Sequence, residues 1–174
     1  MRNLVKSFLS TVTVVLLMVA SFSHAEVPER ANDARPGLLR ALDGNWVMSG
    51  DVKGKPVTYT MVAAPALQGT FTEMRMKDVQ VPAEYEAAVF IGYDGASQAI
   101  LVHWMDNHGP KYSIPHGTGH IAGNTIQFIF PYKTGQFRNT MTYKPDTSTW
   151  QFVLEAAQRD GSWKHFARYD VKQN

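Results

Sequence analysis

The sequence predicts an all-β fold, an antiparallel up-and-down β-barrel of about ten strands with one short N-terminal helix. After Gly44, apolar and polar side chains alternate with a period of two, as in half-buried strands. Turn residues, most often glycine, interrupt this pattern almost every ten residues, and no crossover helix lies between the runs. Such short links favour antiparallel neighbours, and closing the sheet into a barrel removes its two exposed edges.

The first 25 residues are predicted to be a cleaved signal peptide. Arg2 and Lys6 precede an apolar stretch of about 13 residues, shorter than the roughly 20 that a membrane span needs. Small residues at Ser23 and Ala25 fit the positions that a signal peptidase reads. We therefore expect a periplasmic or secreted protein with no membrane anchor after cleavage. Residues 26–36 are then a mobile leader, and residues 37–174 form the barrel domain.

Charge and cysteine content exclude several functions. Removing Arg2 and Lys6 with the signal reduces the 17 basic residues to 15, which equals the number of acidic residues. Because no run of basic residues is interleaved with aromatic ones, nucleic acid is not expected as a partner. The chain has no cysteine, which excludes disulfides, thiolate catalysis and cysteine-based zinc sites.

A short helix is predicted over residues 36–42, and it covers one end of the barrel. Pro36 suits a first helical position, Leu39 and Leu42 lie on one face, and Gly44 follows the end. The ten predicted strands cover residues 45–52, 56–63, 70–79, 85–93, 97–106, 113–122, 125–131, 136–144, 150–158 and 163–171.

Charged side chains indicate which face of a strand points outward. In residues 70–79, the charge at Arg75 and Lys77 predicts that Met74 and Met76 point inward. In residues 163–171, Lys164 marks the outer face and turns Trp163, His165, Ala167 and Tyr169 inward. In residues 97–106 the two faces are equally apolar, so either could face the core.

Three motifs resemble a known family of barrels. Leu42-Asp43-Gly44-Asn45-Trp46 resembles the Gly-x-Trp opening of calycin-type barrels such as lipocalins and fatty-acid-binding proteins. Ala88-Val89-Phe90-Ile91-Gly92-Tyr93-Asp94 and Arg159-Asp160-Gly161-Ser162-Trp163 look like an exported bacterial calycin-like group of unknown function, related in shape to haem-binding nitrobindins. In those haem proteins a histidine near the last strand holds the iron, so the resemblance implies haem as a candidate cofactor at His165. Their Gly-rich opening is replaced here by Val47-Met48-Ser49-Gly50.

A barrel of this size either packs its interior with side chains or encloses one small ligand. We expect a small apolar or amphipathic molecule inside the barrel, because methionine walls adapt to irregular ligands, although methionine is also an ordinary core filler. No catalytic set and no metal-ligand set is assigned. The candidate ligand-binding residues are Trp46, Tyr59, Met61, Met74, Met76, His103, His116 and His165.

Two other functions remain open. The first is a metal-assisted enzyme that uses His103, His116 and His120, whose imidazoles would have to converge on one ion. His116 and His120 are about 13 Å apart along an extended strand, so His103 or a bulge would have to complete the site. The second is a protein-interaction scaffold with an exposed aromatic patch at Phe90 or Trp104.

Overall fold

The computed structural model describes residues 33–174, and they form a closed all-β barrel of ten antiparallel strands, as the sequence predicts. The predicted signal peptide and residues 26–32 of the predicted leader lie outside the described residues. The elements are α1 (Gly37–Arg40), β1 (Gly44–Val52), β2 (Lys55–Ala66), η1 (Leu67–Gly69), β3 (Phe71–Asp78), β4 (Glu86–Asp94), β5 (Ala99–Asp106), η2 (Pro110–Tyr112), β6 (Gly117–Ala122), β7 (Thr125–Tyr132), β8 (Gly135–Lys144), β9 (Thr149–Ala157) and β10 (Trp163–Gln173).

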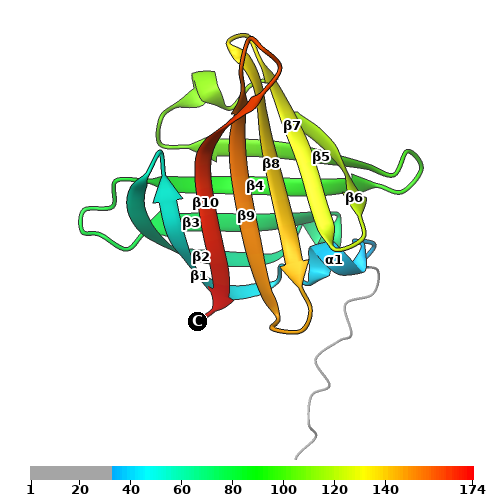
Figure 1. The fold of residues 1–174 in the computed structure, drawn as a ribbon. Helices are drawn as coiled ribbons and strands as arrows, with labels where there is room; N and C mark the ends of the chain where they lie inside the picture. The colour runs from blue at the N-terminus through cyan, green and yellow to red at the C-terminus, as the bar shows by residue number, and fades with distance from the viewer. Residues whose placement is uncertain (1–32) are drawn as a thin grey trace, which may run out of the picture. The chain divides into compact units, whose positions relative to one another are not determined.

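Each strand pairs with the strands before and after it in the chain, and β1 pairs with β10 to close the barrel (Figure 1). The closing ladder runs from Trp46 opposite Gln173 to Val52 opposite Ala167. Every strand therefore has a hydrogen-bonded neighbour on both sides, which removes the sheet edges that could recruit other chains. Within residues 33–174, no helix has the length and hydropathy needed to cross a membrane.

Helix α1 covers the end of the barrel at which β1 begins (Figure 1). Leu39 and Leu42 are completely buried there. Trp46 Nε1 donates a hydrogen bond of 2.7 Å to the Leu42 carbonyl, and Trp150 Nε1 donates one of 3.3 Å to the Ala41 carbonyl. The predicted helix over residues 36–42 is thus present in a shorter form, and it packs on this end through apolar contact and two indole donors.

The inward faces of the strands agree with the alternation in most places. Met74 and Met76 are buried, as the charges on β3 indicate. On β5 the inner face consists of Ile100, Val102 and Trp104, which resolves the face that the sequence left open. The buried side chains of neighbouring strands lie opposite one another in the ladders, as a single barrel interior requires.

The start of β10 departs from the predicted alternation. A β-bulge between His165 and Ala167 inserts Phe166 into the strand. Cross-strand partners share a face, and His165 is opposite Glu155, which forms an ion pair with Arg138. The expectation that His165 and Trp163 point inward was therefore wrong. One extra residue in the strand shifts the alternation by one, so the side chains that precede the bulge point to the opposite face.

Strand β6 is shorter than the predicted residues 113–122. It begins at Gly117, and the preceding residues form a loop that contains η2. The β5–β6 ladder has only three residue pairs, starting at Val102 opposite Gly117. Pro115 has no backbone N–H to donate, so a ladder cannot extend through it as through other residues.

Candidate functional site

The interior of the barrel is packed at the α1 end and hollow at the other. The hollow part is a cavity of about 1670 Å³. Residues of the β1–β2, β3–β4, β5–β6 and β7–β8 loops border it, including Lys53, Glu84, His108 and Thr134. These loops all follow the strand ends opposite α1, so the cavity opens at that end.

Apolar and aromatic side chains make up most of the wall. They come from eight of the ten strands, all except β4 and β6, because alternate residues of a barrel strand point inward. Four methionines give the wall flexible side chains that can adapt to the shape of a guest. The apolar wall residues include Met48, Met74, Met76, Phe130, Met141, Phe152, Leu154 and Phe166.

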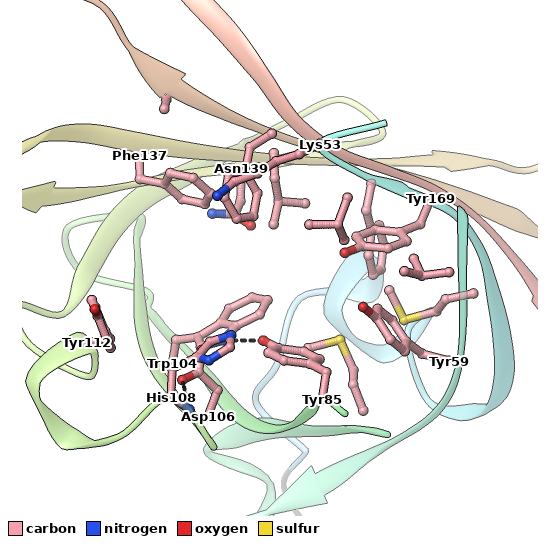
Figure 2. Close-up of a pocket in the computed structure, with 18 of the residues that line it drawn as sticks. Lys53, Tyr59, Tyr85, Trp104, Asp106, His108, Tyr112, Phe137, Asn139 and Tyr169 are labelled. Carbon is pink, nitrogen blue, oxygen red and sulfur yellow. Dashed lines mark hydrogen bonds between the residues drawn. The ribbon is translucent and has the colours of Figure 1, made fainter. Parts of the chain in front are cut away.

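Three tyrosines and a tryptophan gather on one part of the wall (Figure 2). The Tyr59 ring centroid lies 5.5 Å from that of Tyr85 and 5.7 Å from that of Tyr169. Trp104 Nε1 donates a hydrogen bond of 3.1 Å to the Tyr85 hydroxyl. Burial raises the pKa of all three phenols, so their hydroxyls stay protonated at physiological pH. We call Tyr59, Tyr85, Trp104 and Tyr169 the aromatic cluster.

Asn139 of β8 lies on the wall facing the aromatic cluster (Figure 2). The residue is 3% exposed and borders the cavity. None of the side-chain hydrogen bonds among residues 33–174 involves its amide. Because the amide faces the cavity and has no hydrogen-bond partner among the described side chains, it is available to hydrogen-bond a guest or water there.

Acidic and basic groups occupy different parts of the cavity. Asp78, at the end of β3, is 93% buried, with 7% exposed, and Asp106, at the end of β5, is half-buried. Lys53, Lys55, Lys111 and Lys164 border the mouth and are exposed. The negative charge thus lies deeper than the positive charge, which water screens.

Four of the eight predicted ligand-binding residues border the cavity, namely Tyr59, Met74, Met76 and His165. Trp46 and Met61 are buried in the packed part of the barrel and do not border the cavity. His103 is exposed on the outer face of β5, and His116 is exposed in the loop before β6. The structure therefore brings Tyr59, Met74 and Met76 together and separates them from His103 and His116.

Of the three histidines proposed for a metal-assisted enzyme, His103 and His116 lie near each other and His120 does not. The His103 and His116 ring centroids are 5.9 Å apart, across the β5–β6 boundary. His120 is four residues further along, which on an extended strand is about 13 Å. Within residues 33–174, no three side chains of the types that bind metals are close enough to hold an ion.

The position of His165 does not fit a haem ligand. Its Nε2 donates to Asp51 Oδ2 at 2.7 Å, and its side chain is 47% exposed. This hydrogen bond also lowers the pKa of Asp51. Asp51 is opposite Arg168 in the β1–β10 ladder, and both lie on the outer face. The ring at the mouth is thus held away from the interior in which an iron-bound macrocycle would have to sit.

Trp104 was expected in an exposed outer patch, and that expectation was wrong because Trp104 faces the cavity. The cavity residues that the sequence did not single out include three members of the aromatic cluster, Tyr85, Trp104 and Tyr169, as well as the polar Asp78 and Asn139. Asp78 continues the inward phase of Met74 and Met76, a signal that the sequence does contain. Asn139 carries no comparable signal, because asparagine is common on outer faces as well.

A family model described as a protein of unknown function, DUF1579, matches residues 34–173, which are nearly all of the described residues. The chain belongs to the DUF1579 family. The ten-stranded antiparallel barrel of this DUF1579 protein fits the calycin-like shape that its sequence motifs resemble. No curated protein matches the chain.

Proposed function

We propose that this DUF1579 protein is an exported binding protein that holds a small apolar or amphipathic molecule inside its barrel. The observation that carries the proposal is the cavity of about 1670 Å³, larger than the roughly 300–1,000 Å³ of ordinary small-molecule sites. A stable domain normally fills its interior, so a hollow of this size in a closed barrel favours a guest.

The distribution of polarity supports an amphipathic guest. Methionine and phenylalanine side chains surround most of the space, while tyrosine hydroxyls and the Asn139 amide supply a few fixed polar contacts. Ligand sites commonly combine an apolar wall with a small number of placed polar groups that orient the ligand. The guest therefore has an apolar body and at least one polar group.

The binding test uses N-phenyl-1-naphthylamine, a neutral apolar dye whose fluorescence rises in apolar surroundings. We expect the wild-type protein to raise the emission of the dye with saturable binding. Met76→Trp adds an indole to the cavity wall and should weaken binding about tenfold, because it removes space that the dye needs. Arg75→Trp, one residue along on the outer face, is the matched control and should bind as the wild type does.

Circular dichroism and thermal unfolding establish that each variant is folded, and Met141→Trp offers a second filling position should Met76→Trp unfold the barrel. Native mass spectrometry of protein from its own host should reveal a co-purifying guest. No dye binding together with no guest would refute the binding proposal.

Export predicts a mature chain that begins at Glu26, and measurement of the intact mass checks this. A chain that retains residues 1–25 would contradict export.

A further inference from the structure

We infer that the cavity is built for an organic ammonium ion on an apolar chain, whose positive group rests against the aromatic cluster and between Asp78 and Asp106. This inference rests on the proposed function and specifies the chemistry of the guest. It depends on three observations that concern the rings, the acids and the amide that faces them.

The first observation is the aromatic cluster itself. Tyr59, Tyr85 and Tyr169 form a continuous chain of ring contacts, with Trp104 hydrogen-bonded to Tyr85. Figure 2 shows these four side chains around the open centre of the cavity. Cations are attracted to aromatic faces within about 6 Å of the ring centroid, and tryptophan and tyrosine give the strongest attraction. The three phenols are protonated and therefore neutral, so they do not repel a cation.

The second observation is acidic charge beside the rings that no base neutralises. Asp78 is opposite Tyr59 in the β2–β3 ladder, and Asp106 is opposite Ala87, two residues beyond Tyr85. Neither carboxylate has a basic partner within 4 Å among residues 33–174. Their known partners are backbone amides, from Gln80 at 3.0 Å and from His108 at 3.1 Å. Burial weakens screening, so an unpaired carboxylate at this depth attracts a cation strongly.

The surroundings of the two acids favour a cation over an anion. Glu84 adds a third carboxylate at the same side of the mouth. The lysines of the mouth are exposed, and Lys53 Nζ lies 5.0 Å over the Phe166 ring instead of reaching the acids. An anionic head group would thus meet buried negative charge inside and only water-screened positive charge at the rim.

The third observation is the Asn139 amide, which borders the cavity across from the rings. Its Oδ1 can accept a hydrogen bond from an ammonium N–H, and it has no partner within the described chain that competes for this role. The methionine-rich wall beyond it then surrounds the apolar chain of the guest.

The test compares three competitors that share one alkyl chain and differ in head-group charge, namely decyltrimethylammonium, decanoate and 1-decanol. Each displaces bound N-phenyl-1-naphthylamine from the wild-type protein. We expect decyltrimethylammonium to compete at least about tenfold more strongly than decanoate, with 1-decanol between them. Decylammonium should compete at least as well as decyltrimethylammonium, because only its N–H groups can reach an acceptor such as Asn139 Oδ1.

The double variant Asp78→Asn with Asp106→Asn removes both charges but keeps an oxygen acceptor for each backbone amide. It should abolish the preference for the cation and leave 1-decanol unchanged. Glu86→Gln, an exposed acid one residue from Tyr85, is the matched control and should keep the preference. Equal or better competition by decanoate in the wild type overturns this inference while the dye still binds, whereas failure of the dye itself overturns the binding proposal.

Discussion

Arg35 shows how one buried residue can fix the segment before the barrel. It is 2% exposed, and all five of its N–H donors have acceptors. Two bidentate pairs join it to Asp33 and Asp43, and Nη1 also donates to Thr72 Oγ1 at 2.8 Å. A buried guanidinium is tolerated when its charge is compensated and its donors are satisfied. Because Thr72 lies within the barrel, Arg35 ties residues 33–35 to β3.

The Asp33 carboxylate makes this network sensitive to acid. The hydrogen bond from Arg35 lowers the pKa of Asp33 to about 2. Since the folded-state pKa is depressed, its contribution to stability is complete above the unfolded value of about 3.9 and is lost as the pH falls toward 2. We predict that Asp33→Asn lowers the free energy of unfolding by about 1–2 kcal/mol at pH 7.

Urea unfolding of wild type and Asp33→Asn between pH 7 and pH 2 checks this prediction. The difference between them should stay constant down to about pH 5 and shrink between about pH 4 and pH 2. Asp146→Asn, in the exposed β8–β9 turn, controls for the loss of a surface carboxylate. A difference that persists at pH 2 would show that Asp33 acts in some way other than through its charge.

The residues of the site were only partly predictable from the sequence. Met74 and Met76 were found because charged neighbours on β3 revealed the phase of the strand. Trp46 and Met61 share the inward phase but lie in the packed part, and alternation contains no information about depth along the barrel axis. His165 was misplaced because a bulge is not visible as a break in composition.

At the scale of elements, two glycines allow neighbouring strands to approach closely. A Cβ at Gly50 of β1 would lie 1.8 Å from the Arg168 carbonyl oxygen, and one at Gly119 of β6 would lie 1.9 Å from the Gln127 carbonyl oxygen. Both obstacles are backbone, which cannot move aside as the end of a side chain can. Close approach of a neighbouring backbone is one of the physical reasons for glycine inside a strand.

We predict that Gly50→Ala and Gly119→Ala each destabilise the barrel by about 2–4 kcal/mol, because the strands must separate to admit a methyl group. Gly95→Ala is the control, since its Cβ would meet only the Tyr93 side chain at 4.0 Å. Thermal and urea unfolding measure the three variants side by side. Equal free energies of unfolding for all three variants would mean that the strands can separate to admit a methyl group without loss of stability.

The strands themselves were predictable because short glycine-containing turns and a period of two leave few alternatives. All ten appear in the structure, and their limits differ from the predicted ones by only a few residues. The largest difference is at β6, where Pro115 prevents pairing and the chain forms a loop with η2 instead. Local propensity cannot reveal this, because Ser113 and Ile114 suit a strand as well as a loop.

At the scale of the whole molecule, the cavity depends on closure between the first and last strands. Val47 is opposite Lys172 in the β1–β10 ladder, and Asp51 is opposite Arg168. An open sheet would leave these residues unpaired and would not enclose a hollow. Closure is therefore the property of the fold on which both the binding proposal and the cation inference depend.

The absence of cysteine makes closure directly testable, because any disulfide must come from introduced residues. We predict that Val47→Cys with Lys172→Cys crosslinks on mild oxidation, since paired antiparallel residues have Cα atoms about 4.5–5.5 Å apart, within disulfide range. Val47→Cys with Arg168→Cys places the second thiol four residues away, about 13 Å along the strand, and should not crosslink.

The crosslinked barrel should also unfold at a higher urea concentration than its reduced form, because the disulfide restrains almost the entire unfolded chain. Non-reducing electrophoresis and urea unfolding measure both effects. Equal crosslinking of the two pairs would show that the β1–β10 pairing is not stable, and the barrel would then not keep its cavity closed.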